Sequence, residues 1–586
     1  GDWSSDVCSS DLRALSVFIL LLGITVASRT TVASIVKEGD EFKMVDGRKE
    51  GAVAFAKFDE AIHETGWNYF SVRSNDAYSN YDQSYAAGFL EGALTAKQIY
   101  IQIKVHYPDP APPRKVQDFF DANARWEEQE KKSGRNPEYW EQRTLLDVQV
   151  NGIYDGYMSV ATGRMLNVTR YQVIVANYEY DVWDLSIVLP EEGSKCYFDD
   201  DPNRPFKNAC HGSERVDHCS ALIKVLPDYE DVLFSHVTWA GAISMYRMYK
   251  AYDLRLHRSS RDASLIPGHK VAMSSYPGRF TSGDDFYITS ARLAIQETTI
   301  AIWDESLNKN IKPQSVLQWA RSALATRLAR SAEEWVELYT LYNSGLYNNQ
   351  WMVFDYNKFH KGRGMDDGAF WIFEQIPGGG HAGDMTPMLR EQGYWASYNI
   401  PYFKDIYELC GYPAKVIEWE AKAMSWEQAA RAQIFRRDHV KVHDLASMAR
   451  MMRYNDYQHD PISSCNCTPP YTSQYTISSR SDLHDRKGTY PFPALAYRDH
   501  MGTDVKITGE ALLDDHLGAA IICGPTYDQQ PVFDWKTLDP MDHEDFPERY
   551  DFPFYIARMD IDGEMDFDYT PFKHLNQRSE ERRVGK

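Results

Sequence analysis

The sequence has no excess of basic residues. Its 586 residues include 63 lysines and arginines against 84 aspartates and glutamates, which gives a formal net charge of −21. This balance argues against binding to nucleic acid or to an anionic membrane surface through bulk electrostatics. An acidic compartment, or a substrate recognised by its shape and apolar contacts, fits the charge better.

The commonest catalytic signatures are also missing. No G-x-x-x-x-G-K-[ST], H-E-x-x-H or G-x-S-x-G sequence occurs, so the usual phosphate-binding, zinc-protease and serine-hydrolase motifs are absent. Residues 378–383 satisfy G-x-G-x-x-G, but the strand before and the helix after that phosphate binding needs are not evident in the sequence. We predict a flexible turn there.

The acidic and aromatic residues of 534–568 indicate a solvated rim, and we expect no metal or organic cofactor.

Long apolar runs are scarce. Residues 13–30 contain a basic residue, an apolar run over 14–27 and then small residues, the pattern of a secretory signal peptide. A buried helix or an uncleaved anchor is the alternative. No other apolar run approaches ~20 residues, so we expect no transmembrane anchor. The first methionine is Met44, and residues 1–12 and 578–586 resemble translated sequencing-adapter sequence, so both are set apart from the fold.

Cysteine is sparse, with eight residues, of which Cys8 lies in the adapter-like segment. Secretory entry would make the other seven disulfide partners or a nucleophile. The disulfide candidates are Cys196 and Cys210, which flank a loop, and Cys465 and Cys467, which lie two apart. We predict that Cys410 and Cys523 are buried free thiols. An odd count leaves one thiol unpaired, and Cys219 is the candidate.

Two asparagines match the glycosylation sequon, Asn167 in NVT and Asn466 in NCT. The match is short, and Asn466 lies between two cysteines. Both are predicted glycosylation sites.

A polar, charged segment over 191–218 separates two parts of the chain and is typical of an exposed, cleavable loop. A linker between two independent domains is the alternative that composition leaves open. The residues that follow predict a β-hairpin, with strands over 219–226 and 231–239 joined by a turn at 227–230. This hairpin places Cys219 opposite the segment 236–239, although its one-residue register stays open.

Cys219 directly follows the loop, and this position suggests a specific chemistry. A cysteine attacks as the thiolate and needs a nearby base. If the chain is cut before Cys219, the new α-amino group lies on the same residue and has an ordinary pKa of ~8. The alternatives are a half-buried structural cysteine or a disulfide to Cys210. A papain-like site is disfavoured because its cysteine usually opens a helix.

Periodicity predicts further elements along the chain. We expect strands at 286–289 and 351–356 and helices at 116–142, 242–252, 315–343 and 445–452.

Several long sequence strings resemble, in order, the motifs of the phospholipase B-like family of lysosomal and secreted proteins. They are DHCSALIKVLP, SHVTWAGAISMYRMYKAY, SSYPGRFTSGDDFYI, QETTI, NSGLYNNQWMVFDY, YWASYNIPYF, RAQIFRRD, MRYNDYQHDP and SSRSDL. The resemblance runs from about residue 60 to 575.

The resemblance implies an α+β fold, a four-layer αββα sandwich of the N-terminal-nucleophile hydrolase type with peripheral helices. It also implies a precursor that cuts itself between His218 and Cys219. Residues 31–218, including the cleavable loop 191–218, would form a smaller fragment and residues 219–577 a larger one. The two fragments would stay associated as one domain, and a homodimer is left open.

The resemblance also implies roles for individual residues. Cys219 is the nucleophile, His236 orients or protonates groups at it, and Trp239 walls the substrate pocket. Thr299 of QETTI and Asn399 of SYNIP are similar to the polar groups that stabilise an oxyanion. Arg431 of RAQIF is similar to the arginine that closes the site.

Three departures from the family pattern are visible: Val237 replaces an asparagine, His218 replaces a small residue, and Cys-x-Cys replaces Cys-x-x-Cys. The bulky His218 puts the efficiency of self-cleavage in question.

The resemblance implies a secreted or lysosomal hydrolase of acyl ester or amide bonds in lipids. An amidase acting on N-acyl small molecules is one alternative, and a lipid-binding glycoprotein with little turnover is another.

Overall fold

The structure is a computed structural model, and it describes residues 30–108, 111–190, 219–559 and 567–571. Several of the predicted features lie outside these residues. They are the two adapter-like ends, the apolar run of the signal peptide, and the loop 191–218 with Cys196, Cys210 and His218.

A large sheet forms one half of the molecule. Among the described residues it has eleven strands. Adjacent strands are antiparallel except for β4 and β7, which run parallel. In spatial order the strands are β17 (Gly379–Asp384), β16 (Phe370–Ile376), β13 (Asn349–Asp355), β12 (Leu293–Thr299), β11 (Phe286–Thr289), β10 (Lys270–Ser275), β7 (Arg247–Asp253), β4 (Trp67–Ser74), β3 (Ala54–Asp59), β1 (Thr30–Glu38) and β2 (Glu41–Asp46).

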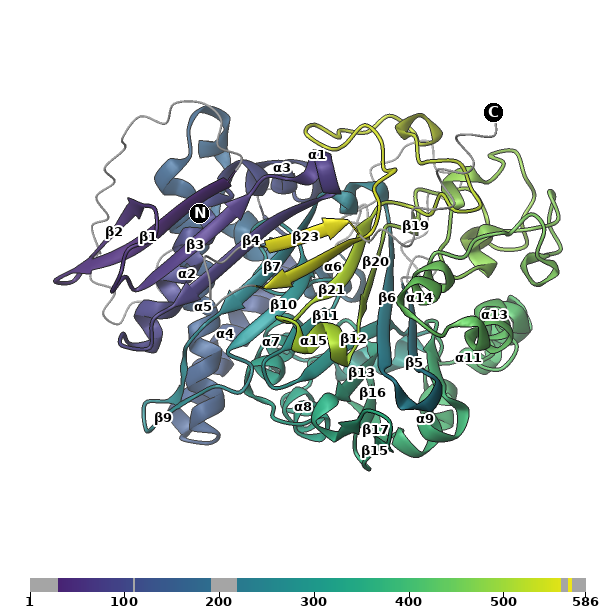
Figure 1. The fold of residues 1–586 in the computed structure, drawn as a ribbon, viewed down its shortest axis with the longest axis horizontal. Coiled ribbons are helices and arrows are strands. Elements are labelled where there is room, and N and C mark those ends of the chain that lie inside the picture. The colour runs from purple at the N-terminus through teal and green to yellow at the C-terminus, as the bar shows by residue number, and fades with distance from the viewer. Residues whose placement is uncertain (1–29, 109–110, 191–218, 560–566, 572–586) are drawn as a thin grey trace.

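A second sheet lies against the first (Figure 1). Its described strands, in spatial order, are β18 (Tyr394–Ser397), β5 (Cys219–Val225), β6 (Val232–Ala240), β20 (Asp504–Thr508), β21 (Ala519–Cys523), β22 (Tyr555–Met559) and β23 (Phe567–Pro571). The short strand β19 (Met501–Gly502) also pairs with β6.

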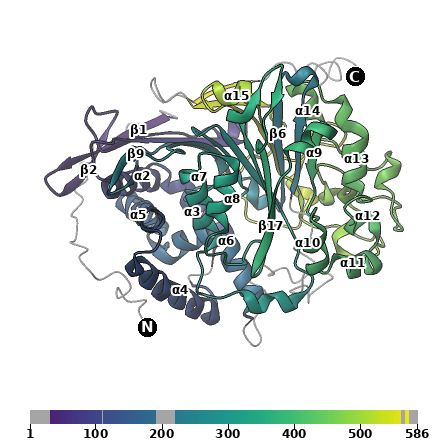
Figure 2. The same cartoon turned by 90° about the horizontal axis from the view of Figure 1, so that it is seen from below.

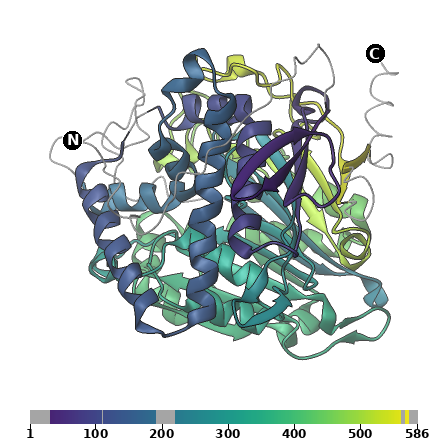
Figure 3. The same ribbon diagram turned by 90° about the vertical axis from the view of Figure 1, so that its left-hand side faces the viewer.

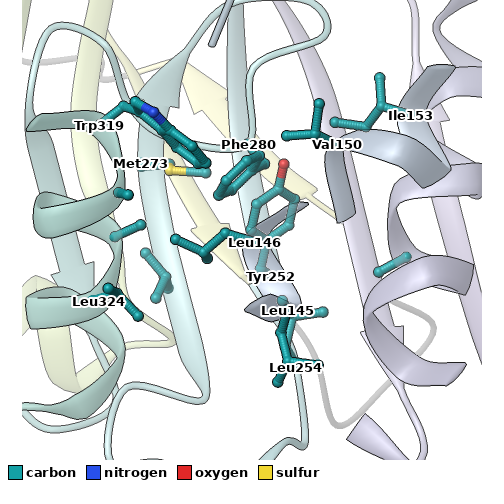
Figure 4. Packing of buried hydrophobic residues seen from close by; sticks show 14 of the residues in the cluster. Leu145, Leu146, Val150, Ile153, Tyr252, Leu254, Met273, Phe280, Trp319 and Leu324 are labelled. Atoms are coloured by element: carbon teal, nitrogen blue, oxygen red, sulfur yellow. The ribbon is translucent and has the colours of Figure 1, made fainter. Parts of the chain in front are cut away.

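Helices cover the outer face of the large sheet. They are α2 (Asn80–Leu94), α3 (Ala96–His106), α4 (Arg114–Ser133), α5 (Pro137–Val160), α6 (Arg170–Val188), α7 (Gln318–Leu328) and α8 (Ala332–Thr340). In the close-up of this core, Leu146 of α5 and Trp319 of α7 lie near Tyr252 and Met273 of the sheet (Figure 4). Figure 3 shows the blue helices beside the purple N-terminal strands. Burial of this apolar surface holds the helices on the sheet.

A second group of helices packs on the outer face of the second sheet. They are α10 (Lys404–Leu409), α11 (Tyr412–Glu418), α12 (Ala421–Met424), α13 (Ala430–Asp438) and α14 (Leu445–Met452). Figure 2 shows α5–α8 on one side of the strands and α10–α13 on the other. Alternation along the strands explains this packing: in β5, Ala221 and Ile223 face the large sheet, whereas Leu222 faces the helices. The fold is therefore mixed α and β.

The structure also includes shorter elements. They are α1 (Ile62–Thr65), α9 (Thr386–Gln392), α15 (Glu510–Asp514) and the two-stranded ribbons β8 (His257–Ser259) with β9 (Asp262–Leu265) and β14 (Phe359–His360) with β15 (Gly364–Met365). In the part of the chain that the structure describes, no helix is long and apolar enough to cross a membrane.

The helix predicted over 242–252 is wrong. A short 3-10 turn, Ala242–Met245, leads into strand β7, whose side chains alternate between the two cores. Met248 and Tyr252 face the helices, while Tyr249 and Ala251 face the second sheet. Because β7 carries apolar residues on both faces, its sequence lacks the apolar–polar alternation that identifies a strand. Its pairing with β4 and β10 makes this segment a strand rather than a helix.

The helix predicted over 315–343 is two helices. Helix α7 ends at Leu328, and Ser331 then accepts a hydrogen bond from the Glu334 N–H and begins α8. The stretch predicted as one helix over 116–142 likewise divides between α4 and α5. At the break between α7 and α8, Ser331 is a common helix-starting residue, because the serine side chain satisfies an unpaired N–H group of the first turn.

The glycine-rich turn was predicted only in part. Pro377 and Gly378 do turn, but the glycines that follow form strand β17, paired with β16. The predicted strands at 286–289 and 351–356 correspond to β11 and β13, and the predicted helix 445–452 is α14.

Candidate active site

The predicted hairpin around Cys219 is confirmed. Strands β5 and β6 are antiparallel, and the 3-10 turn Pro227–Tyr229 lies between them. The structure also fixes the register: Cys219 pairs with Thr238, and Ala221 pairs with His236. Paired residues share a face, and so do residues two apart. Cys219, Thr238 and His236 therefore lie on the face of the second sheet that is turned toward the large sheet.

Cys219 is the first residue of β5, and contacts at its backbone fix its position. Its N–H points to the Asn399 side-chain oxygen at 3.5 Å, and its carbonyl oxygen accepts a hydrogen bond of 2.6 Å from Arg431. The residue is only 3% exposed. Burial raises the pKa of the thiol well above its ordinary value, and the nearby Glu297 carboxylate raises it further. At rest the sulfur is therefore a thiol and needs a base to become nucleophilic.

His236 is fully buried beside Cys219. Its Nε2 lies 3.0 Å from the Glu297 carbonyl oxygen, a contact that requires the proton on Nε2. Its Nδ1 then carries a lone pair, and this atom has no hydrogen-bond partner among the described residues. Burial, with the nearby Lys506 charge, lowers the pKa of His236 well below its ordinary value, so the ring is neutral.

Glu297 was missed as a site residue, although it lies within the QETTI string. Strand β12 brings its carboxylate close to Cys219 and His236, and one donor atom from each of the three lies within 4.8 Å of the others. The Tyr347 hydroxyl donates to one carboxylate oxygen at 3.1 Å. Burial raises the pKa of Glu297 well above its ordinary value. The available signal was the acidic residue of the QETTI string, two positions before Thr299.

Thr299 and Asn399 lie together, as the resemblance implies. The Asn399 amide donates to the Thr299 carbonyl oxygen at 2.9 Å. Asn399 has a left-handed backbone with φ of 67°, and the Tyr412 hydroxyl donates to its carbonyl oxygen at 2.8 Å. The Thr299 hydroxyl is buried and has no partner among the described residues. It is therefore available to a group that enters the site.

Arg431 joins three segments around the start of β5. Besides the Cys219 carbonyl, its guanidinium donates to the Tyr398 carbonyl oxygen at 2.8 Å. Its charged carbon lies 4.5 Å from the centre of the Trp239 ring. Trp239 follows Thr238 in β6, so its side chain lies on the face of the second sheet opposite to that of Cys219. Its indole N–H donates to the Ile477 carbonyl oxygen. Trp239 nonetheless lines the cavity described below.

A buried ionic network that sequence reasoning missed lies behind Thr238. The Thr238 hydroxyl donates to Asp284 at 3.0 Å and accepts from Lys506 at 2.6 Å. Lys506 also contacts Asp284 and Asp504, each at 2.9 Å, and Arg247 pairs with both acids. Burial opposes ionisation of Asp284, but the charges of Arg247 and Lys506 hold its pKa well below its ordinary value. The network fixes the residue that pairs with Cys219.

A cavity of about 280 Å³ opens beside Cys219. Its walls include aromatic side chains of distant elements, among them Tyr180, Trp183, Tyr276 and Tyr347. Tyr180 and Tyr347 stack with ring centres 4.1 Å apart. Substrate sites of this kind combine apolar walls with a few placed polar groups.

Other predicted residues lie away from the cavity. Asn167 and Asn466 are exposed, and Cys465 forms a disulfide with Cys467 on either side of Asn466. Cys410 and Cys523 are buried free thiols, as predicted. In the described part of the chain, including its share of 534–568, Cys219, His236 and Glu297 are the one group whose donor atoms are close enough to hold a metal ion.

Comparison with known proteins adds to this geometry. The family model described as Phospholipase B matches residues 54–557. A Bos taurus protein named "Putative phospholipase B-like 2" is 38% identical over 527 residues, which cover 87% of this chain and 86% of that protein. "Phospholipase B-like protein D" of Dictyostelium discoideum is 35% identical over 529 residues, covering 88% and 89%. The expected resemblance is confirmed over most of the chain, and the chain belongs to the phospholipase B family.

Proposed function

We propose that this chain is an acyl hydrolase that cleaves ester or amide bonds of lipid substrates with Cys219 as its nucleophile. The observation that carries the proposal is that Cys219 begins β5 at the wall of a cavity, next to a neutral His236. Membership in a family named for a phospholipase supports a hydrolase-like function.

The proposal includes a cut between His218 and Cys219. The cut converts the Cys219 backbone N–H into an α-amine, at the atom that faces the Asn399 side-chain oxygen. An α-amine has an ordinary pKa of ~8 and accepts the thiol proton without a second residue. The raised pKa of the buried thiol makes such a base necessary.

The proposed reaction has two steps. The Cys219 sulfur attacks the substrate carbonyl carbon, its proton passes to the α-amine and then to the leaving alcohol or amine, and a thioester forms. Water then attacks the thioester and releases the acid and the free thiol. The Thr299 hydroxyl, which has no partner in the part of the chain that the structure describes, and the adjacent Asn399 amide would stabilise the oxyanion of both steps. Arg431 would hold the Cys219 backbone in place.

The finer fold and the cellular route are part of the same proposal. Three apolar cores support a four-layer αββα sandwich of the N-terminal-nucleophile type. One lies between α2–α8 and the large sheet, one between the two sheets, and one between the second sheet and α10–α14. The exposed Asn167 and Asn466 and the Cys465–Cys467 disulfide support passage through the secretory route to the lysosome or the exterior.

The Cys219→Ser variant tests the proposal. We expect the wild-type chain to yield two fragments after acidification or limited proteolysis, and mass spectrometry to place the new N-terminus at Cys219. A thiol-directed probe should label Cys219, and Cys219→Ser should abolish fatty-acid release from phospholipids. Cys523→Ser, which removes another buried free thiol, is the matched control and should keep activity.

Three results would contradict or redirect the proposal. Unchanged fatty-acid release by Cys219→Ser would place the nucleophile elsewhere. Turnover of N-acyl amides but not of phospholipids would identify an amidase. An uncut wild-type chain that binds lipid without hydrolysing it would leave the lipid-binding glycoprotein as the function.

A further inference from the structure

Three donor atoms converge at the start of β5 from three different strands. They belong to Cys219 of β5, His236 of β6 and Glu297 of β12, and all lie within 4.8 Å of one another. Each residue is at most 3% exposed. In a tetrahedral Zn²⁺ site, with bonds of about 2.3 Å to sulfur and about 2.1 Å to nitrogen, these two donor atoms lie about 3.6 Å apart. The three side chains therefore have to move inward by about 1 Å to share an ion.

We infer that Cys219, His236 and Glu297 form a binding site for a soft divalent cation of the Zn²⁺ class, and that the bound ion blocks the Cys219 thiol.

The orientation of His236 supports the site independently of the distances. Its Nε2 proton is directed to the Glu297 carbonyl oxygen at 3.0 Å, and its Nδ1 lone pair is buried with no described partner. Histidines that bind metals characteristically donate their other ring N–H to a carbonyl or carboxylate, which fixes the ring and its tautomer.

The carboxylate of Glu297 is held in the same way. The Tyr347 hydroxyl donates to one oxygen at 3.1 Å, and the Asn349 amide, with its nitrogen turned toward the acid, donates to the other at 2.9 Å. Such outer contacts position a ligand and raise the affinity of a metal site. Cys219 and Tyr347 both line the cavity, so the site has a route of entry from it.

The donor set determines which ion binds. Thiolate with imidazole and one carboxylate favours Zn²⁺ and Cd²⁺, whereas Mg²⁺ and Ca²⁺ require oxygen ligands. Binding forms metal–sulfur and metal–carboxylate bonds and releases the protons of the Cys219 thiol and the Glu297 acid to water, with no change of oxidation state. A sulfur bound to the ion is no longer free to attack a carbonyl carbon. This inhibition depends on the proposed function, whereas the binding itself does not.

Cd²⁺ titration of the intact, chelator-stripped protein tests the inference, because a cadmium thiolate has an ultraviolet charge-transfer absorption. We expect one equivalent to give this absorption in the wild type and in Cys410→Ser and Cys523→Ser. Cys219→Ser should lose it, and His236→Gln should bind at least about 10-fold more weakly. Tyr347→Phe, which removes one outer contact, should lower the affinity about 10-fold. Mg²⁺ should produce no change.

A second measurement uses the wild type alone, so it does not depend on any variant folding. Stoichiometric Zn²⁺ should protect Cys219 from iodoacetamide, as read by peptide mass spectrometry, and chelation should restore labelling. No charge-transfer absorption at one equivalent, an unchanged absorption in Cys219→Ser, or full labelling in the presence of Zn²⁺ would each overturn the inference. Metal binding without any hydrolase activity would leave the site standing and contradict the proposed function instead.

Discussion

Two adjacent carboxyl groups near the cavity, Asp284 and Asp285, respond to burial in opposite ways. Asp284 is paired with Arg247 and Lys506, so its pKa lies well below its ordinary value. Asp285 accepts one hydrogen bond, from the Tyr287 hydroxyl at 3.1 Å, and its other oxygen has no partner among the described residues. Burial raises the pKa of Asp285 from 3.8 to about 7. The side-chain partners, rather than the depth of burial, decide which acid is ionised.

The Asp285→Asn variant follows from this difference. The folded wild type retains a proton that the unfolded chain releases above its lower pKa, so the free energy of unfolding falls as the pH rises from about 4 to about 7. Asparagine cannot ionise and keeps the acceptor for Tyr287. The variant should match the wild type near pH 4 and exceed it near pH 8 by up to about 4 kcal/mol. Urea unfolding at both pH values measures this, and an identical pH dependence in the two proteins would contradict the assignment.

At the scale of elements, helices α2 and α5 cross at unusually close range. Gly88 and Gly92 of α2 lie against the backbone of α5, and Gly152 and Gly156 of α5 lie against the backbone of α2. A Cβ atom built on Gly92 would lie 1.9 Å from the Ile153 carbonyl oxygen, and one on Gly156 would lie 2.0 Å from the Phe89 carbonyl oxygen. The two backbones are in direct contact, and a side chain at any of these four glycines would separate the helices.

The Gly92→Ala variant should therefore be destabilised, although alanine normally favours a helix by about 1 kcal/mol over glycine. The overlap with the Ile153 carbonyl requires a backbone shift, and overpacking of this kind costs about 1–3 kcal/mol. Thermal unfolding should show a lower midpoint. Gly379→Ala is the matched control, because a Cβ at Gly379 meets nothing within 4 Å. A Gly92→Ala protein as stable as the wild type would disprove the close contact.

The elements also show where sequence patterns stop being informative. The Cys219 hairpin was predictable because its turn residues and two short apolar strands are local signals. Strand β7 was predicted as helix because its residues are buried on both faces, which removes the alternation that identifies a strand. The break between α7 and α8 is marked by Ser331, a local signal that the apolar spacing concealed.

At the scale of the molecule, the segments before and after the loop 191–218 share one sheet and meet where β4 pairs with β7. Strand β4 lies between β3 and β7 in one continuous sheet and pairs with β7 along its length. Buried polar contacts cross the same boundary. Glu91 pairs with Lys250 at 2.5 Å, and Asp184 accepts from the Tyr347 N–H at 2.7 Å.

A chain cut before Cys219 should therefore remain one particle. We expect the two fragments to elute together in gel filtration at the volume of the uncut chain and to separate only in denaturant. Each fragment expressed alone should fail to fold, because each lacks strands that complete the large sheet. Fragments that separate under native conditions would show that the shared sheet is not what holds them together.

The amino-acid sequence by itself determined the family, the hairpin and the cysteine that begins it, because long motif strings and turn residues are read locally. It also placed Thr299, Asn399 and Arg431 at the site by resemblance. Only the tertiary structure decided that Cys219 pairs with Thr238, and that Glu297 and the Arg247–Lys506 network lie beside that pair. These neighbours come from strands far apart in the chain. Their contacts arise from sheet pairing and sheet packing, which local periodicity does not encode.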